Sequence, residues 1–149
     1  MARRTTIEGM AELERAIQRL GKVPTKIATK AARAGAKIAL KDARANAPED
    51  EGNLKKGIVM KAERSRKQGK KVFDVKLDPK MNDVFVKISE TGERSYYPAS
   101  QEYGFFTVNG RYIPGYRYLR KAIDNNEQAI EKAIIDVGLD EIDKAWNAR

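Results

Sequence analysis

The spacing of apolar residues changes near Pro48 in this chain of 149 residues. Before Pro48, apolar residues recur every three or four positions, as on one face of an amphipathic helix. From Ile58 to Ile88 they alternate with polar residues, as in half-buried strands. Beyond residue 125 the helical spacing returns. This order predicts an α+β domain in which an antiparallel sheet is packed by helices from both ends of the chain.

The N-terminal part is expected to form two helices. Thr5 and Glu8 have the spacing of a capping box, so a first helix is predicted over about 6–20, ending at Gly21. Pro24 suits the first turn of a second helix, predicted over 24–46. Gly35 lies in its middle and costs about 1 kcal/mol relative to alanine. We therefore expect either a very close backbone contact or a bend there.

Three strands are predicted over 58–62, 73–77 and 84–88, and 96–103 is a candidate fourth strand. Asn109-Gly110 lies between two apolar runs and is a strong hairpin signal. The last helix is expected to begin between residues 125 and 128, and Gly138 could break it late. The whole chain, 1–149, is thus predicted as a single domain. Its expected parts are a helical pair (6–46), a sheet (54–103), a projecting aromatic loop (104–116) and a C-terminal helical segment (117–149).

Composition indicates a globular protein with a charged surface. Hydrophobic residues are 41% of the chain and charged residues 34%. No apolar run approaches the roughly 20 residues of a membrane-spanning helix, and the N-terminus lacks the apolar core of a signal peptide. Cysteine is absent, which suits synthesis in a reducing cytoplasm. No association with a membrane is expected.

The sequence offers little for catalysis. Histidine is absent, which removes the usual general base and the commonest metal ligand. Paired carboxylates could serve a magnesium nuclease, and the nearest candidates are Glu49-Asp50-Glu51, or Asp74 with Lys76. Their spacing matches no metal motif, so a solvated loop and an exposed strand face are the simpler interpretations. We expect no catalytic residue, no metal and no cofactor, and hence no enzyme.

Charge is distributed unevenly around a formal net charge of +9. Seven bases from Lys22 to Arg44, six of them in the predicted second helix, are spaced three or four apart and so share one face. This basic stripe is open to three interpretations: a solvated helix face, a surface for phosphates, or a surface for an acidic partner. The segment "RSRKQGKK" allows the same range, from a disordered loop tip to a binding loop. The C-terminal region is acidic instead. The basic stripe comprises Lys22, Lys26, Lys30, Arg33, Lys37, Lys41 and Arg44.

Aromatic residues are concentrated between Ser95 and Leu119, which hold all six tyrosines and two of the four phenylalanines. Tyrosine, phenylalanine and arginine are enriched in protein interfaces. Aromatics interleaved with bases can also stack on single-stranded nucleic acid, and packing within the chain is a third possibility. The short arms of the predicted hairpin favour a protein interface.

Three segments in order resemble a known family. Ala47-Pro48 followed by Gly52 to Ile58 resembles an alanine-proline, acidic link, glycine-x-leucine-basic signature. Tyr97 through Glu102-Tyr103-Gly104 is similar to a tyrosine-rich Glu-aromatic-Gly step. The Pro-aromatic-Leu-Arg segment that follows this step resembles Ile113-Pro114 together with residues Tyr118 to Ala122. These are features of the tail-completion, or head–tail joining, proteins of long-tailed double-stranded-DNA bacteriophages, to which lambda-type minor tail protein Z is related.

The resemblance implies a structural virion protein of the tail and neck, made in the bacterial host cytoplasm. It implies a homo-oligomeric ring, with six copies expected, around the DNA channel. The neighbours would be the tail terminator and the stopper or adaptor, with only non-specific DNA contact. The alternative is a small basic protein that binds DNA or RNA without sequence preference. The predicted interface residues are Glu102, Tyr103, Gly104, Phe105, Phe106, Tyr112, Pro114, Tyr116 and Tyr118.

Overall fold

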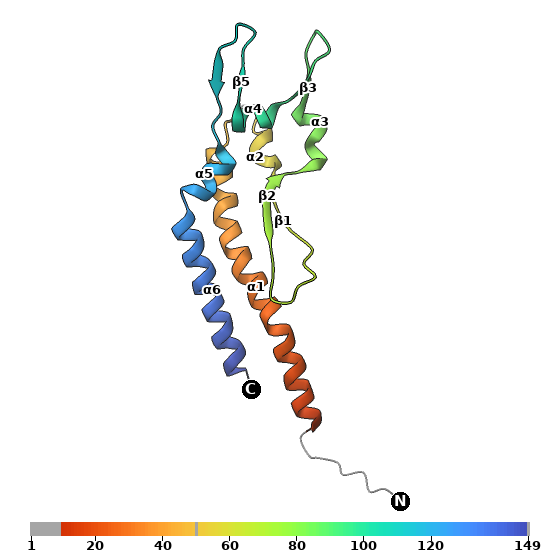
Figure 1. Ribbon diagram of the computed structural model, residues 1–149, viewed down its shortest axis with the longest axis vertical. Coiled ribbons are helices and arrows are strands. Elements are labelled where there is room, and N and C mark those ends of the chain that lie inside the picture. The colour runs from red at the N-terminus through yellow and green to blue at the C-terminus, as the bar shows by residue number, and fades with distance from the viewer. Residues whose placement is uncertain (1–9, 50, 149) are drawn as a thin grey trace, which may run out of the picture.

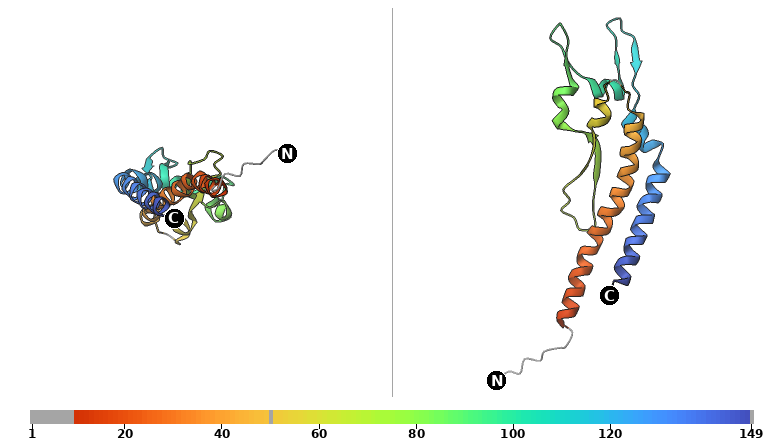
Figure 2. Two further views of the ribbon diagram at one scale, coloured as in Figure 1. Left: turned by 90° about the horizontal axis from the view of Figure 1, so that it is seen from below. Right: turned by 180° about the vertical axis from the view of Figure 1, so that it is seen from behind.

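The computed structural model describes residues 10–49 and 51–148, with side chains from Gly21 onward. Its longest element is the helix α1 (Met10–Asn46). On one side of α1 packs the antiparallel helix α6 (Glu127–Asn147), and on another lies a hairpin of β1 (Ile58–Ala62) and β2 (Phe73–Leu77) (Figure 1). The molecule is therefore elongated along α1 (Figure 2).

The two predicted N-terminal helices are one helix. The structure shows α1 running through Gly21 and Pro24 without a break, while residues 6–9 of the prediction lie outside the described part. Proline lacks an N–H but its φ is compatible with a helix. Another part of the chain contacts the helix near this point: the Gln68 side-chain amide donates to the Gly21 carbonyl, and the Gly69 N–H donates to Thr25 Oγ1. The expected stop at Gly21 was wrong because tertiary contacts support the helix there.

The predicted single sheet is instead three separate two-stranded antiparallel sheets. The β1–β2 pair has the expected strands, with Ile58 opposite Leu77 and Ala62 opposite Phe73. Two further pairs are shorter: β3 (Val86–Ile88) with β4 (Arg94–Tyr96), and β5 (Gly104–Phe106) with β6 (Tyr112–Pro114). Both short hairpins project from the end of the molecule opposite the N-terminus of α1 (Figure 1).

Short helices replace parts of the predicted strands. The predicted strand 84–88 begins in α3 (Asn82–Phe85), which follows the 3-10 turn η1 (Pro79–Met81). The candidate fourth strand is mostly the helix α4 (Tyr97–Tyr103), with Pro98 in its first turn. The alternating pattern predicted a strand here, but Phe85 belongs to α3. Its side chain is fully buried and packs against Gly57.

The core lies where the C-terminal end of α1 meets several short elements. These include α2 (Asn53–Gly57), which lies just before β1, and α5 (Tyr118–Asp124), which precedes α6. The small residues of α1 let the other elements approach closely. The buried cluster consists of Ala43, Ala47, Leu54, Ile58, Phe85, Tyr118 and Ala122.

The α1–α6 contact explains Gly35. A Cβ on Gly35 would lie 2.9 Å from two side-chain carbons of Ile134, so the expected close contact exists and glycine is the residue that permits it. The predicted break at Gly138 does not occur, since α6 continues to Asn147. Within the described residues, no helix has the length and apolar character needed to span a membrane.

Candidate interaction site

The β5–β6 hairpin is a short two-stranded arm closed by a tight turn. Phe105 pairs with Ile113 and Phe106 with Tyr112. The Gly110 N–H donates to the Thr107 carbonyl at 2.8 Å, and the Thr107 N–H donates to the Arg111 carbonyl at 2.8 Å. Gly110 has φ +76°, whereas a two-residue type I′ turn would also need positive φ at Asn109. The hairpin was therefore predicted correctly, but its turn is displaced by one residue and glycine forms the bulge.

Apolar side chains on this hairpin face solvent. Phe106 is 73% exposed and Val108 is fully exposed. The Phe106 and Tyr112 rings contact each other with centroids 5.2 Å apart, and the Tyr112 hydroxyl donates to the Tyr103 carbonyl. These contacts order the rings without covering them. Exposed apolar side chains grouped on a projecting element are typical of a protein contact surface.

The base of the hairpin is held by a crossing of two backbone segments. Gly104 has φ +86°, and a Cβ there would lie 2.3 Å from the Ile113 carbonyl oxygen. A Cβ on Gly115 would lie 2.4 Å from the Glu102 carbonyl oxygen. Only glycine permits both approaches. The Arg117 N–H donates to the Glu102 carbonyl at 3.1 Å and fixes the crossing.

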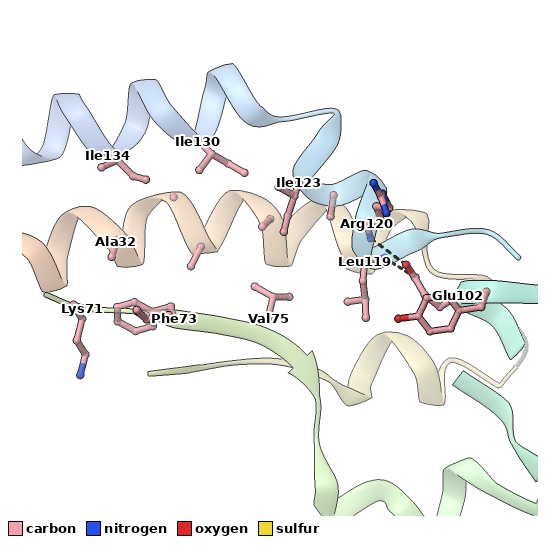
Figure 3. Close-up of a pocket in the computed structure, with 16 residues that line it drawn as sticks. Ala32, Lys71, Phe73, Val75, Glu102, Leu119, Arg120, Ile123, Ile130 and Ile134 are labelled. Carbon is pink, nitrogen blue, oxygen red and sulfur yellow. Dashed lines mark hydrogen bonds between the residues drawn. The ribbon is translucent and has the colours of Figure 1, made fainter. Parts of the chain in front are cut away.

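The Glu102 side chain secures the same base from within. It is 5% exposed, and its carboxylate accepts the backbone N–H groups of Leu119 at 2.9 Å and Arg120 at 3.2 Å (Figure 3). These are free donors at the start of α5, so a carboxylate satisfies them and complements the helix dipole. Glu102 thus joins α4 to α5 at the base of the hairpin.

The nine predicted interface residues differ in how far they are buried. Tyr118 is fully buried in the core, and its burial, with the nearby Glu102 carboxylate, raises the pKa of its phenol. Tyr118 and Glu102 are interior residues of the chain because α5 must pack on α1. Gly104 is half-buried. The exposed members, which form the hairpin surface of this site, are Tyr103, Phe105, Phe106, Tyr112, Pro114 and Tyr116.

Some of the seven bases of the basic stripe contact other parts of the protein. Lys30 Nζ lies 2.6 Å from Glu141 Oε2 on α6. The Arg33 guanidinium lies 5.5 Å from the centroid of the Phe73 ring. Arg44 donates twice to the Ile58 carbonyl, at 2.7 and 3.0 Å. Three of the seven therefore tie α1 to its neighbours, which the sequence did not reveal.

The remaining four bases of the stripe are exposed: Lys22, Lys26, Lys37 and Lys41. None of them takes part in an ion pair with another described residue. The basic segment 64–71 is tied to α1 at its tip through Gln68 and Gly69 rather than extending freely. Fewer bases of α1 are therefore left without a partner in the described part of the chain than the sequence indicated.

An apolar groove of about 630 Å³ lies between α1, β2 and α6 (Figure 3). Ile123, Ile130 and Ile134 line one side, and Phe73 and Val75 line the other. Glu102 is at one end, where both carboxylate oxygens are already occupied by backbone donors. The groove therefore presents apolar surface, with no free polar group from Glu102 to direct a reaction.

The β3–β4 hairpin is a projecting element that the sequence reasoning missed. Its turn resembles that of β5–β6: the Gly92 N–H donates to the Ser89 carbonyl at 2.9 Å, and Gly92 has φ +83°. Ile88 on this hairpin is 71% exposed. The signal available was Gly92, a turn-forming residue that follows the alternating run ending at Ile88.

The acidic residues proposed for a metal site are dispersed. Among the described residues, no three acidic side chains are close enough together to hold a metal ion. Glu49 instead pairs with Lys55 at 2.9 Å, which holds the pKa of its carboxyl below the ordinary value. Asp50 lies outside the described residues.

These features define a class of protein: a small elongated α+β protein with exposed apolar side chains on a projecting hairpin. A comparison with family models identifies the group within that class. Residues 11–98 match the HK97-gp10-like model, described as "Bacteriophage HK97-gp10, putative tail-component". Because the match spans more than half of the chain, the protein belongs to this family of bacteriophage tail components.

The match ends at residue 98 and so covers α1 to the start of α4. The β5–β6 hairpin and α6 lie beyond it. No curated protein and no solved structure matches the chain. Family membership makes this a structural protein of the phage tail and places it in the virion. The hairpin surface must be interpreted from its own geometry.

Proposed function

We propose that this protein completes the tail at its head-proximal end and joins tail to head, as one subunit of a ring around the DNA channel. One observation carries the proposal: the hairpin surface exposes apolar side chains, projects from the body, and is anchored at its base by the Glu102 hydrogen bonds and by close backbone contacts at two glycines. Apolar side chains that are ordered but uncovered gain contact area at low entropic cost when a partner covers them.

The proposed partners are a neighbouring copy and the adjoining neck and tail proteins, namely the tail terminator and the stopper or adaptor. We propose six copies as the ring number, by resemblance to tail-completion proteins. DNA would pass through the ring with non-specific contact only. A channel lined by tight phosphate contacts would hold the DNA back, since each contact adds to its retention and salt dependence.

The proposal includes no catalytic role. Two carboxylates are buried in the described part of the chain, and both are engaged: Glu102 by backbone donors and Glu141 by Lys30. A general acid or base must instead be free to exchange a proton with a substrate.

The test is substitution on the hairpin surface, Phe106→Ser or Tyr112→Ser, in phage particles that depend on this protein. Both side chains are exposed, so the purified variants should fold like the wild type by circular dichroism and melting. Incorporation into tails should fall, and filled heads without tails should accumulate.

The matched control is Val84→Ser, because Val84 is 47% exposed on α3 rather than on the hairpin. Its particles should assemble normally. The proposal fails if the hairpin variants are incorporated as well as the control. It also fails if they unfold the isolated chain, since the aromatics would then be part of the fold.

A further inference from the structure

The outer surface of α6 combines apolar and acidic residues that have no cover. Four large apolar residues recur at spacings of four, three and four and form a stripe: Ile135, Leu139, Ile142 and Trp146 are 50%, 57%, 48% and 86% exposed. Asp136 and Asp143 are exposed beside it, and neither pairs with a base in the described part of the chain. We call this surface the α6 outer face.

The acidic side of the α6 outer face points away from α1, and it also carries one exposed base, Lys132, at about 160° from Ile134. Ile134 contacts Gly35 of α1 and so marks the inner side of α6. At about 100° per residue, Asp136 and Asp143 lie about 200° and 180° around the helix from Ile134. The four apolar residues lie about 80–140° from it, between the inner side and the acids.

The exposed lysines of α1 lie on the part of the helix turned away from Gly35, and Lys30, at about 220° from Gly35, lies among them and reaches α6 through its ion pair with Glu141. Lys26, Lys37 and Lys41 lie about 180°, 200° and 240° around α1 from Gly35, at the same 100° per residue. All three are exposed. We call this surface the α1 basic face. The α1–α6 pair therefore has an acidic and apolar surface on the outer side of α6, and exposed lysines on the part of α1 that does not contact Ile134.

The two faces also lie at the same height along the molecule. The Lys30–Glu141 ion pair, with N and O atoms 2.6 Å apart, and the contact of Gly35 with Ile134 fix how α1 and α6 are aligned. The lysines at 26–41 and the acids at 136–143 therefore overlap along the pair. Two copies placed side by side in the same orientation would bring the acidic face of one against the basic face of the next.

We propose that a second copy of this chain occupies the α6 outer face, with its α1 basic face toward the acids. This inference rests on the proposed function, because it names the surfaces by which successive copies meet. Such a contact is head-to-tail, since it uses two different surfaces of the chain, and repeated contacts of this kind close a ring or extend a filament. Complementary charge sets the orientation and register of the copies. Burial of the apolar stripe supplies attraction that salt does not screen.

The charge test uses two variants that should fail alone and succeed together. The first carries Lys26→Glu, Lys37→Glu and Lys41→Glu, and the second carries Asp136→Lys and Asp143→Lys. In either variant both faces have the same sign, so self-association measured by sedimentation at low salt should weaken at least about tenfold. In an equimolar mixture each face again meets an opposite one, and association should return.

A matched control changes three exposed bases elsewhere: Lys61→Glu, Lys70→Glu and Lys80→Glu. Its net charge changes by the same amount as that of the triple-lysine variant. It should associate like the wild type. A separate pair of changes, Leu139→Ser with Trp146→Ser, should weaken association at high salt as well as at low salt. Circular dichroism of each variant establishes that the fold is kept, as the exposure of these side chains predicts.

Three results would overturn the inference: a monomeric wild-type chain at all concentrations, a mixture that fails to associate, or a triple-lysine variant that associates normally. Loss of DNA binding without loss of association in that variant would assign the α1 basic face to DNA instead. Failure here leaves the proposed function standing if Phe106→Ser still blocks incorporation into tails. If the charge swap works but Phe106→Ser is incorporated normally, the inference holds and the proposed role of the hairpin is wrong.

Discussion

Glu102 illustrates how one buried charge determines the direction of a whole element. Its carboxylate replaces the capping residue that α5 lacks, since Arg117 precedes that helix in a left-handed conformation, with φ 52°, and offers no side-chain cap. Because Glu102 belongs to α4, its carboxylate both caps α5 and attaches α5 to α4. The tyrosine-rich step singled out in the sequence is therefore important for a structural reason first.

Replacing Glu102 by alanine should destabilise the protein by about 2 kcal/mol, because two buried N–H groups lose a charged acceptor. Glu102→Gln keeps one acceptor oxygen and should cost about half as much. Urea denaturation of both variants measures the difference. Glu90→Ala, at an exposed position in the turn of the β3–β4 hairpin, serves as the control and should change stability little. Equal stabilities for all three variants would show that the carboxylate does not cap α5.

At the scale of elements, the packing of α6 on α1 depends on the absence of a side chain at Gly35. Gly35 lets Ile134 and Ile130 approach the α1 backbone, and Lys30 with Glu141 closes the pair further along. Helix propensity alone disfavours glycine in this position. The close approach of α6 is the reason that glycine fits there.

Gly35→Leu should destabilise the protein by about 1–3 kcal/mol through overpacking, even though leucine favours helix. Ile134→Ala in the same chain frees space and should recover part of the loss, which a double-mutant cycle in urea would measure. Additive effects of the two changes would contradict a direct contact. Leucine at Ala45, which is exposed on α1, is the control.

The Lys30–Glu141 pair should make the docking of α6 depend on pH. The hydrogen bond from Lys30 lowers the pKa of the Glu141 carboxyl below its ordinary value of 4.5. The pair therefore contributes its full stability above about pH 4.5 and loses it as the pH falls through the lowered pKa. Glu141→Gln should flatten this part of the stability profile between pH 5 and pH 3, as followed by urea denaturation. An unchanged profile would show that the pair contributes nothing.

At the scale of the whole molecule, the buried core lies near one end of an elongated shape, and the two short hairpins project beyond it (Figure 1). The buried cluster gathers around the C-terminal part of α1, with α2, β1, α3 and α5 packed on it. The two short hairpins extend beyond it (Figure 1). Local stability should therefore differ along the molecule, since few apolar contacts support the hairpins.

Hydrogen exchange should reveal this gradient. Amides of α1 around Ala39 and Ala43 should exchange slowest, because both residues are buried and opening there requires loss of the core. Amides at the turns of the β5–β6 and β3–β4 hairpins should exchange fastest. Uniform protection throughout the described residues would contradict a core confined to one end of the molecule.

The sequence determined the local elements whose pattern is continuous. The helical spacing before Pro48 and after residue 125, the β1 and β2 strands and the β5–β6 hairpin all follow from periodicity and turn chemistry. These features depend on interactions between near neighbours, which the sequence displays directly. Membership of a phage tail family also rests on the sequence, through residues 11–98.

Tertiary structure decided what periodicity could not. It joined the two N-terminal helices across Pro24, because Gln68 and Gly69 satisfy backbone and side-chain groups that lie far away in the sequence. It turned the candidate fourth strand into α4 and divided the predicted sheet into three pairs. It also placed Tyr118 inside and left Phe106 outside. The physical reason is that burial depends on which distant surface covers a side chain, and an aromatic residue fits a core and an interface equally well.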